Sequence, residues 1–338
     1  MNIDKSKIVI YNINTSPGVM VIINHLKETF NKRGIFLKEV TNCDDPSLVY
    51  IPYGPKCAYL CAKRKRQVLV DLMVDYYGYG SKNRFLDLLK KGYWNNSMTW
   101  LNCATWLLYY YREYVILKQP YPHMFVSKND IKLLKRRFPK TDFIHVANGC
   151  EMPKQIISKT NSKKIRLAVL SNWTSGTLAD VQWIIDDYLP KIKEVYPNVE
   201  LYVAGKCVNP LIENYFKENK DVTYLGWVES LDVFFSNVDI YLATVPKGCG
   251  VLNKVLDAFA HKTLCIGHRM SFTGFDGLNE GFITCHSVQD YLSAIKTYIE
   301  NKTYVQKCID NAYEYILENN NWEKNYNKFV EDLMTSRL

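Results

Sequence analysis

The strongest constraint on the fold is an alternation of short apolar runs with segments of helical periodicity, which restarts after the middle of the chain. In the first half, runs rich in β-branched residues predict strands at residues 7–11, 35–40, 47–54, 66–77 and 123–126. A helical segment follows the first run and ends at Gly34, a typical helix stop. Because parallel neighbours in a sheet need a crossover connection, strands that alternate with helices predict a parallel sheet.

The second half repeats this pattern after a polar, aperiodic stretch at 151–164, which is typical of a linker. Apolar runs there predict strands at residues 164–172, 199–206, 222–228, 238–245 and 264–268. Helices are predicted at 179–197, 209–219 and 253–262, with two more between Ser287 and Leu338. The 338 residues therefore suit two doubly wound α/β domains of Rossmann type. Ligands bind such sheets at the carboxyl ends of the strands, so a cleft between two facing domains is the expected site.

Positive charge is concentrated in the first half of the chain. Residues 1–155 hold 24 of the 43 Lys and Arg but only 12 of the 34 Asp and Glu, so their net charge is +12 against −3 for the rest. A basic domain suggests an anionic partner such as acidic lipid, a phosphorylated carrier or nucleic acid, although scattered surface Lys gives the same excess. No standard nucleic-acid-binding motif accompanies the charge, which disfavours a nucleic-acid partner.

The ten cysteines form no Cys-x-x-Cys pair and have no zinc-ligand spacing, so we interpret them as reduced, buried thiols. Reduced thiols in this number favour a cytoplasmic protein. The sequence shows no apolar stretch of bilayer-spanning length and no signal-peptide pattern after Met1. Peripheral contact with the inner face of a membrane is compatible with all of these features.

The most informative segment is KGCGVLNKVLDAFAH, residues 247–261, which lies between two predicted strands. Gly248 and Gly250 allow the backbone to approach a diphosphate closely, and the free N–H groups of the following helix favour its negative charge. Lys254 is a candidate phosphate contact, although its place in the helix also fits an exterior lysine. Asp257 is either a ribose ligand or a helix acid that points to solvent.

This segment resembles the donor site of the retaining GT-B glycosyltransferases of family four, the group 1 transferases. In that family a Gly-rich loop precedes a helix, and the two together have the pattern G-x-x-N-K-V-L-E-A-M-A. Gly250 and Asn253 match the Gly and the Asn of this pattern, and Asp257 stands at the position of the Glu. The likeness extends to two further segments. Residues 180–204 are similar to the first helix and second strand of the family's donor-binding domain, and residues 222–243 are similar to the base-binding turn and the strand that follows it. The resemblance implies the GT-B fold, with two facing Rossmann-like domains and a cleft between them.

The resemblance also implies a glycosyltransferase that moves a sugar from a UDP- or GDP-linked donor to a saccharide or lipid-linked saccharide, with retention of anomeric configuration. Residues 1–155 would bind the acceptor and 163–319 the donor, and a helix at 320–338 would pack back onto the N-terminal domain. No metal or other cofactor is expected, because backbone amides and Lys254, a catalytic candidate, would stabilise the leaving diphosphate. The implied donor-binding residues are Gly18, Gly226, Trp227, Val228, Gly248, Gly250, Val251, Leu252, Asn253, Lys254 and Asp257.

Two positions depart from the family pattern. The first acid of its Glu-x7-Glu pair falls at Cys249, which cannot accept hydrogen bonds from sugar hydroxyls as a carboxylate does. The loop at 171–176 lacks the basic residue that relatives usually carry for the diphosphate. That charge would then come from Lys206, Lys247 or Lys254, or backbone amides would act alone.

Asp71 and Asp75 lie at the end of an apolar run, where active-site residues accumulate in parallel sheets. Each is a catalytic candidate that would orient the acceptor hydroxyl or act as a base, and a capping role fits each equally well. The six histidines show no metal spacing and no evident Asp or Ser partner, so we interpret them as structural, with His25 expected nearest the cleft.

Residues 82–118 combine three Trp and several Tyr with flanking Lys and Arg. This composition suits an interfacial amphipathic helix on an acidic membrane, and it suits equally a core helix with a Tyr-rich surface. The basic run at 63–66 is either a phosphate-binding cluster or a solvated charge run.

Two other functions fit a pair of Rossmann-like domains. A sugar-nucleotide epimerase would need acid and base residues on both faces of the sugar, and the sequence shows no convincing pair. A non-catalytic sugar-binding protein is disfavoured by the unpaired cysteines and the missing signal-peptide pattern. From the basic half and the Trp-rich segment, the acceptor is expected to belong to a surface polysaccharide or a lipid-linked oligosaccharide.

Overall fold

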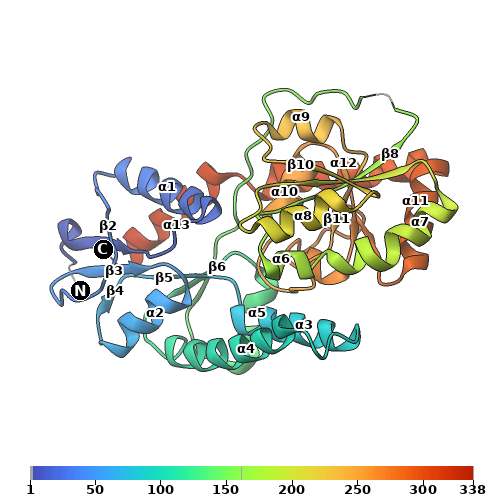
Figure 1. Ribbon diagram of the computed structural model, residues 1–338. Helices are drawn as coiled ribbons and strands as arrows, with labels where there is room; N and C mark the ends of the chain where they lie inside the picture. Colours follow the sequence, from blue (N-terminus) through green and yellow to red (C-terminus); the bar gives the residue numbers. More distant parts are fainter. Residues whose placement is uncertain (1–2, 161, 338) are drawn as a thin grey trace.

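The computed structural model describes residues 3–160 and 162–337. Figure 1 shows two α/β lobes joined at a narrow waist, with the N-terminal lobe in blue to green and the C-terminal lobe in yellow to red. We define the N-terminal lobe as the elements before the linker together with the last helix, and the C-terminal lobe as the elements between the linker and that helix. All strand pairs in both lobes are parallel.

The N-terminal lobe contains two parallel sheets that follow one another, with strand orders β2-β1-β3-β4 and β5-β6-β7. A single bridge between Tyr53 and Leu72 connects them. After the short helix η1 (Lys5–Lys7), the strands are β1 (Ile8–Tyr11), β2 (Lys38–Val40), β3 (Val49–Pro52), β4 (Gln67–Val68), β5 (Asp71–Val74), β6 (His123–Phe125) and β7 (Phe143–His145).

The run at 66–77, predicted as one strand, is divided between these two sheets. β4 pairs with β3, whereas the amide of Asp71 donates to the carbonyl of Pro122 and starts the pairing of β5 with β6. The prediction of one strand was wrong because an apolar run has no signal for the point at which it changes its hydrogen-bonding partner.

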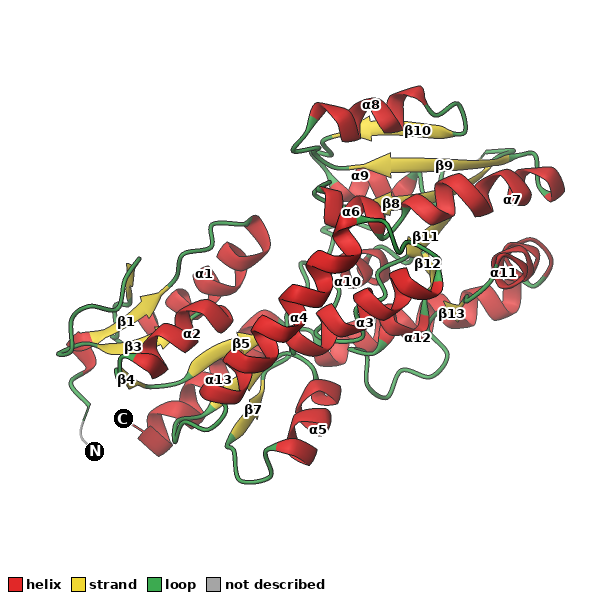
Figure 2. Ribbon diagram, turned by 60° about the horizontal axis from the view of Figure 1, so that its bottom comes forward, coloured by secondary structure: helices red, strands yellow, loops and turns green. Residues whose placement is uncertain are grey.

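Helices cover both faces of these sheets. They are α1 (Pro17–Asn31), α2 (Gly54–Lys63), α3 (Tyr77–Lys90), α4 (Ser97–Ile116) and α5 (Lys128–Arg137). Buried side chains of β1, β3 and α1, among them Ile10, Ile23 and Ile51, form the main core of this lobe. α3 packs along α4, and Figure 2 shows both helices extending from the N-terminal lobe toward the C-terminal lobe.

The C-terminal lobe has one sheet, in the order β10-β9-β8-β11-β12-β13. Its strands are β8 (Ile165–Leu170), β9 (Val199–Ala204), β10 (Val222–Gly226), β11 (Ile240–Ala243), β12 (Leu264–Gly267) and β13 (Ile283–Thr284). β8 is the first strand of the lobe yet lies in the middle of the sheet, between β9 and β11. This reversal of strand order is the switch point at which doubly wound sheets bind ligands.

The helices of the C-terminal lobe differ from the prediction in two places. They are α6 (Ser175–Ala179), the π-helical turn η2 (Ile184–Tyr188), α7 (Leu189–Val195), α8 (Pro210–Glu218), α9 (Leu231–Ser236), α10 (Asn253–Ala260), η3 (Arg269–Phe272), α11 (Val288–Glu300) and α12 (Lys302–Asn319). The helix predicted at 179–197 contains the π-helical turn η2 directly before α7, where Pro190 lacks the N–H that an α-helical ladder would use. Likewise, α11, α12 and α13 (Trp322–Arg337) replace the two C-terminal helices that were predicted.

The last helix, α13, lies against α1 of the N-terminal lobe, where Figure 1 shows it in red beside the blue helix. Tyr326, Phe329 and Val330 are buried in the core of that lobe. At the start of α13 the indole of Trp322 stacks on the imidazole of His25, with ring centroids 4.6 Å apart. His25 therefore joins α1 to α13, and its ring is engaged in packing.

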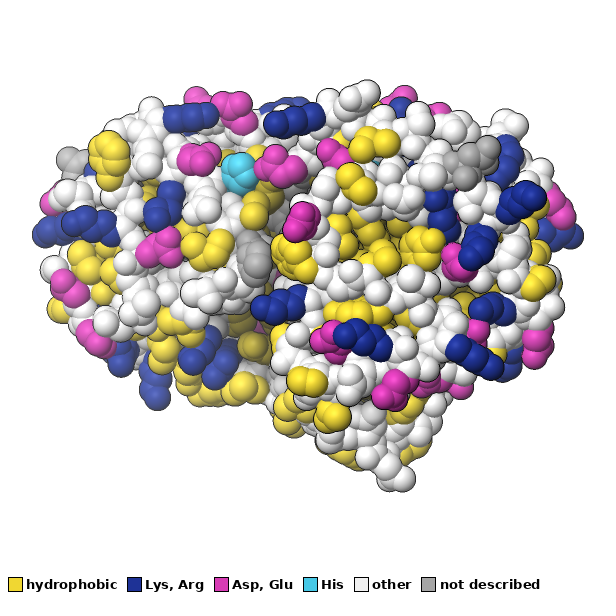
Figure 3. Space-filling view, turned by 45° about the horizontal axis from the view of Figure 1, so that its top comes forward, with side chains coloured by type: hydrophobic (Ala, Val, Ile, Leu, Met, Phe, Trp, Pro, Cys, Tyr) yellow, Lys and Arg dark blue, Asp and Glu magenta, His cyan; other side chains and the backbone are white. Residues whose placement is uncertain are grey.

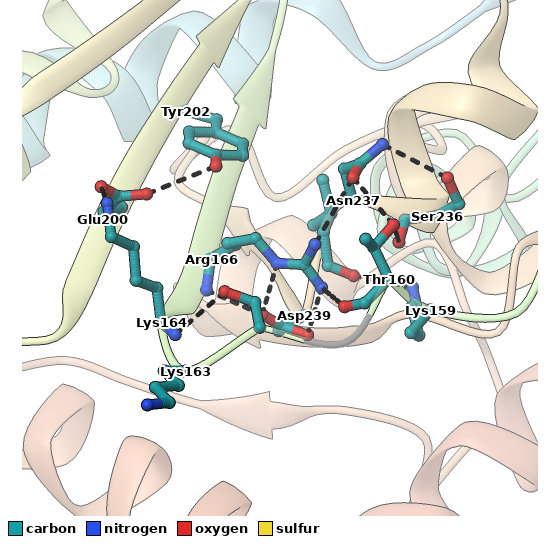
Figure 4. Close-up of polar contacts among 12 residues, drawn as sticks. Lys159, Thr160, Lys163, Lys164, Arg166, Glu200, Tyr202, Ser236, Asn237 and Asp239 are labelled. Atoms are coloured by element: carbon teal, nitrogen blue, oxygen red, sulfur yellow. Dashed lines mark hydrogen bonds and ion pairs between the residues drawn. The ribbon is translucent and has the colours of Figure 1, made fainter.

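The end of the linker is fastened to the C-terminal lobe by polar contacts, and Figure 4 shows those of Arg166 with Thr160 and Asp239. The ammonium of Lys159 donates to the carbonyls of Phe235 and Val238 at 2.8 and 2.7 Å, and burial lowers its pKa to about 8. Arg166, on β8, donates to the carbonyl of Thr160 at 2.9 Å and pairs with Asp239. These contacts hold the linker on the side of the sheet where the strands begin, away from the carboxyl ends.

All ten cysteines are free thiols, and most are buried. On the face drawn in Figure 3, Lys and Arg side chains are interspersed with Asp and Glu over both lobes. Within residues 3–160 and 162–337, none of the helices combines the length and the apolar character that crossing a bilayer requires.

Candidate functional site

A cavity of about 310 Å³ lies between the lobes, at the carboxyl ends of β8 and β11. Its floor is formed by residues at the ends of these strands, and its rim by the Gly-rich loop, by the start of α10 and by Arg84 from α3. The lining residues include Arg84, Ser171, Trp173, Asp180, Lys247, Val251, Leu252, Asn253 and Lys254. The cavity therefore occupies the place where a doubly wound sheet binds its ligand.

The Gly-rich loop adopts a backbone that favours glycine and lies against the opposite lobe. Gly248 and Gly250 have φ of +67° and +64°, in the left-handed region. A Cβ at Gly250 would come within 2.0 Å of Asp75 Oδ1. Both the conformation and the close approach of Asp75 therefore exclude a side chain at Gly250. Val251, Leu252 and Asn253, which follow it, line the cavity.

α10 begins without a capping side chain, since Leu252 occupies its N-cap position. The first N–H groups of a helix have no intrahelical acceptor, so the start of α10 offers donors at the cavity rim. Gly18, at the start of α1, faces this point, because a Cβ there would lie 3.9 Å from Asn253 Nδ2. The amide of Asn148 donates to Asn253 Oδ1 at 3.1 Å and holds the side chain in place.

Lys254 lines the cavity, and Asp257 lies one turn further along α10. The ammonium of Lys254 is 3.3 Å from Asp257 Oδ2 and remains half exposed. Burial raises the pKa of the Asp257 carboxyl above its ordinary value. The structure thus brings these two predicted site residues together, with Lys254 in the cavity lining and Asp257 next to it.

Asp75 lies directly after β5 and reaches the Gly-rich loop from the N-terminal lobe. Its carboxylate forms an ion pair with Lys247, which lines the cavity. Next to it, Asp130 Oδ2 accepts from the amides of Gly250 and Tyr76, each at 2.9 Å. Burial, together with the charge of Asp75, raises the pKa of Asp130 to about 7. Carboxylates of the N-terminal lobe therefore hold the loop from across the cleft.

Asp71 does not meet the expectation of a catalytic role. Its side chain is fully buried, and its Oδ2 lies 2.6 Å from Nδ1 of the equally buried His123 on the neighbouring strand. Burial raises the pKa of Asp71, and the side chain has no exposed surface with which to meet an acceptor. The geometry therefore corrects the prediction for Asp71: this carboxyl fastens β5 to β6.

Two of the histidines, interpreted as structural, have acidic partners that were not evident in the sequence. Besides the Asp71–His123 pair, His261 Nε2 lies 2.9 Å from Asp232 Oδ1. These partners are 52 and 29 residues apart in sequence, so spacing along the chain gave no signal for them.

Gly226, Trp227 and Val228 lie at the end of β10, away from the cavity lining. Trp227 and Val228 line a separate, apolar groove of about 540 Å³ between the end of β10 and α9. The carbonyl of Gly226 accepts from the amide of Gly205 at 2.6 Å. Gly205 in turn packs so closely on Ser171, a cavity residue, that a Cβ would lie 1.8 Å from the Ser171 carbonyl oxygen. The structure therefore places the predicted base contacts at the end of β10, and β9 separates β10 from β8, whose end contributes to the cavity.

Sequence reasoning missed Arg84, Asn83 and Asp130. Arg84 pairs with Asp180 of the C-terminal lobe at 2.5 Å, and Asn83 donates to the carbonyl of Lys247 at 2.9 Å. Both lie in residues 82–118, whose composition suits an interfacial membrane helix or a core helix, and the place of Asp130 in the first turn of α5 is typical of a helix cap. In residues 3–160 and 162–337, His, Cys, Asp and Glu side chains form no group of three or more that could hold a metal ion.

Residues 165–301 match the sequence model of the family described as glycosyl transferases group 1. The matched segment carries the Gly-rich loop, α10 and the strands that form the floor of the cavity. The C-terminal lobe belongs to the group 1 glycosyl transferases. The protein is accordingly a glycosyltransferase. No curated protein sequence matches the chain.

Several solved structures share the arrangement of this glycosyltransferase over nearly its whole length. Sucrose-phosphate synthase from Thermosynechococcus elongatus has a TM-score of 0.72 at 11% identity, over 97% of this chain and 98% of that one. Anabaena HepE in complex with UDP and glucose has a TM-score of 0.63 at 11% identity, over 98% and 100%. WaaG, a glycosyltransferase involved in lipopolysaccharide biosynthesis, has a TM-score of 0.60 at 12% identity, over 96% and 99%. At these identities the likeness shows the fold, which is GT-B with two Rossmann-like domains.

Proposed function

We propose that this glycosyltransferase transfers a sugar from a UDP- or GDP-linked donor to a saccharide or lipid-linked saccharide, with retention of anomeric configuration, in the synthesis of a surface glycan. The observation that carries the donor side of the proposal is the cavity at the start of α10, where Lys247 and Lys254 line the space beside uncapped helix amides. The solved structure of Anabaena HepE, which shares the fold, contains UDP and glucose and so supports a nucleotide-sugar donor.

In this proposal the C-terminal domain, residues 163–319, binds the donor, and the N-terminal domain, residues 1–155 with the helix at 320–338, binds the acceptor. Gly248 and Gly250 let the loop approach the diphosphate, and Asp257 binds the ribose hydroxyls through its partly buried carboxyl. The backbone at Gly226, Trp227 and Val228 meets the base at the end of β10, which is separated from β8 by β9. Breaking the glycosidic bond leaves negative charge on the diphosphate, which Lys254 and the amides of α10 stabilise, so the proposed step uses no metal.

Asp75 is the proposed catalytic carboxylate of the N-terminal domain. It lies across the cleft from α10, at the Gly-rich loop, and Lys247 holds it in position. Cys249, which stands at the position of the family's first acid, is buried against α3, since a Cβ at Gly80 would lie 2.6 Å from its Sγ. In this protein the carboxylate next to the transferred sugar therefore comes from Asp75, and it orients the acceptor hydroxyl on the face that the diphosphate leaves.

A thermal-shift panel with UDP, GDP, ADP and CMP tests the donor site. One diphosphate is expected to raise the Tm of the wild-type protein by several degrees, because a ligand that binds only the folded state stabilises it. Asp257→Ala is expected to lose most of this shift, because it removes the ribose contact. Lys262→Ala, past the end of α10, is the matched control and is expected to keep it. Absence of a shift with all four nucleotides would contradict the donor-site proposal.

We further propose that the N-terminal domain contacts an anionic membrane on its cytoplasmic side through the outer face of α4. Residues three and four apart along this helix present exposed apolar side chains, including Trp100, Leu107 and Tyr111, each more than half exposed. Cations lie among the rings: Arg137 is 3.7 Å from the centroid of Tyr110, and Lys118 is 4.0 Å from that of Tyr114. Aromatic side chains interleaved with Lys and Arg suit the headgroup region of an acidic bilayer.

Vesicle co-sedimentation measures this contact. The wild-type protein is expected to sediment with phosphatidylserine-containing vesicles, to sediment less at high salt, and to stay in solution with phosphatidylcholine alone. The triple variant Trp100→Ser, Leu107→Ser, Tyr111→Ser is expected to lose most of the binding. Trp227→Ser, which changes an exposed Trp of the other lobe, is expected to retain it. Wild-type protein that stays in the supernatant with acidic vesicles, or that dimerises through α4 in light scattering, would contradict the membrane proposal.

A further inference from the structure

The cations that line the donor cavity come from outside the loop that follows β8. That loop, residues 171–176, contains no Lys or Arg. Among the described residues, the cavity is lined by the three cations Arg84, Lys247 and Lys254 and by one carboxylate, Asp180. A nucleoside diphosphate carries several negative charges at neutral pH, so a cavity with an excess of cations suits it. Each of these cations has an acidic neighbour: Lys247 pairs with Asp75, Lys254 with Asp257 and Arg84 with Asp180.

Arg84 is the cavity cation that comes from the opposite domain. It lies on α3 of the N-terminal domain, and one of its terminal nitrogens, Nη2, is 2.5 Å from Asp180 Oδ2 of the C-terminal domain. Its Nε is buried and has no hydrogen-bond partner among the described residues. A guanidinium has five N–H donors, and a buried donor without an acceptor costs free energy. The side chain is therefore held at the cavity with hydrogen-bonding capacity to spare.

Phosphate oxygens are the acceptors that suit this geometry. The guanidinium is planar and presents paired N–H donors, which match two oxygens of a phosphate better than the single ammonium of a lysine does. We propose that Arg84 binds the diphosphate of the nucleotide-sugar donor and supplies, from the acceptor domain, the cation that the 171–176 loop lacks. This inference rests on the proposed function of the cavity as the donor site.

The ion pair with Asp180 gives Arg84 a second role as a link between donor binding and domain closure. Asp180 holds the guanidinium of Arg84 at the cavity. The negative charge of Asp180 repels a diphosphate bound next to the carboxylate. Burial raises the pKa of Asp180 to about 6, so ionisation of this carboxyl is already costly. A diphosphate held by Lys254 on one domain and Arg84 on the other favours the closed arrangement of the two. The two partners of one ion pair therefore affect donor binding in opposite directions.

The experiment compares diphosphates with monophosphates by calorimetry, because only the diphosphate offers the second phosphate. UDP, UMP, GDP and GMP are titrated into the wild type, Arg84→Gln, Arg84→Lys, Asp180→Asn and the control Lys91→Met. Lys91, at the end of α3, also contacts the C-terminal domain, with its ammonium 3.8 Å from the ring centroid of Trp183, but it does not line the cavity.

Arg84→Gln is expected to lower the affinity for the preferred diphosphate about ten-fold or more, and the affinity for the matching monophosphate by no more than about three-fold. Arg84→Lys is expected to restore part of the lost affinity for the diphosphate. Asp180→Asn is expected to raise the affinity for the diphosphate, whereas Lys91→Met is expected to leave the affinities for both ligands unchanged. The inference is overturned if Arg84→Gln leaves the affinities for the diphosphate and the monophosphate unchanged, or lowers both equally. It is also overturned if Asp180→Asn lowers the affinity for the diphosphate as Arg84→Gln does, because the ion pair then only joins the two domains. If the wild type binds none of the four nucleotides, the proposed function fails, and this inference fails with it.

Discussion

Asp75→Asn lowers kcat about 100-fold or more and leaves the KM for the nucleotide sugar within a few-fold of the wild-type value. The substitution keeps the size and one hydrogen-bonding oxygen of the side chain but removes the charge that pairs with Lys247. Asp75 is the proposed carboxylate for the acceptor hydroxyl, so its loss acts on the transfer step. The proposed donor contacts are made by other residues, among them Lys254, Asp257 and Arg84. Steady-state kinetics with varied donor and acceptor measure the two parameters separately.

Asp71→Asn is the matched control, four residues earlier on the same segment of chain. Because Asp71 is buried against His123 and has no exposed surface, this variant is expected to lower the Tm and to keep the kcat of the folded protein. The two aspartates appeared equivalent in the sequence. Comparing the two variants distinguishes a carboxylate that acts at the cleft, Asp75, from one that joins two strands, Asp71. Wild-type kcat in Asp75→Asn, or a loss of kcat in Asp71→Asn at unchanged Tm, would reverse these assignments.

Arg166→Met destabilises the C-terminal domain by about 3–5 kcal/mol, which is the expected cost of removing one partner of a buried ion pair. Arg166 is 4% exposed and donates through Nε and Nη2 to both carboxylate oxygens of Asp239, at 2.9 and 3.0 Å (Figure 4). It also donates to the carbonyl of Thr160 and so ties the linker to β8. Removing the guanidinium leaves the Asp239 charge without its counterion and frees the linker. Urea unfolding measures the loss of free energy directly.

Lys164→Met, two residues away, serves as the control for this variant. Its ammonium pairs with Glu200 at an exposed position, and surface pairs contribute about 1 kcal/mol or less. The double variant Arg166→Met, Asp239→Asn is expected to recover part of the stability, because no charge is then left without a partner. Equal effects of Arg166→Met and Lys164→Met would show that the buried pair contributes no more than a surface pair.

The Gly-rich loop shows how far a local motif can specify a site. Its glycines and the start of α10 were predicted from residues 247–261, because left-handed backbone and an open helix end are local properties. What the loop faces depends on contacts with residues more than 100 positions away. Asp75 and Asp130 approach it from the N-terminal domain, and only Asp75 was a candidate in the sequence.

Arg84 illustrates the opposite case, because its surroundings in the sequence gave no sign of a role at the cavity. It lies among aromatic and basic residues whose composition suited a membrane helix, and nothing near it resembles a phosphate-binding motif. Its position at the cavity follows from the packing of α3 against the C-terminal domain, which brings it to Asp180. A sequence pattern describes one segment at a time, whereas this contact joins two segments that lie 96 residues apart.

The sequence by itself determined the parallel α/β character of both halves, the linker between them, and the loop and helix of the proposed donor site, because periodicity, β-branched runs and glycines act over a few neighbouring residues. The tertiary structure decided where the run at 66–77 changes sheets, which aspartate is buried with a histidine, and which cation reaches the cavity. These outcomes depend on which distant surfaces pack together. Burial and partner choice are set by that packing, and neither is encoded in the local order of residues.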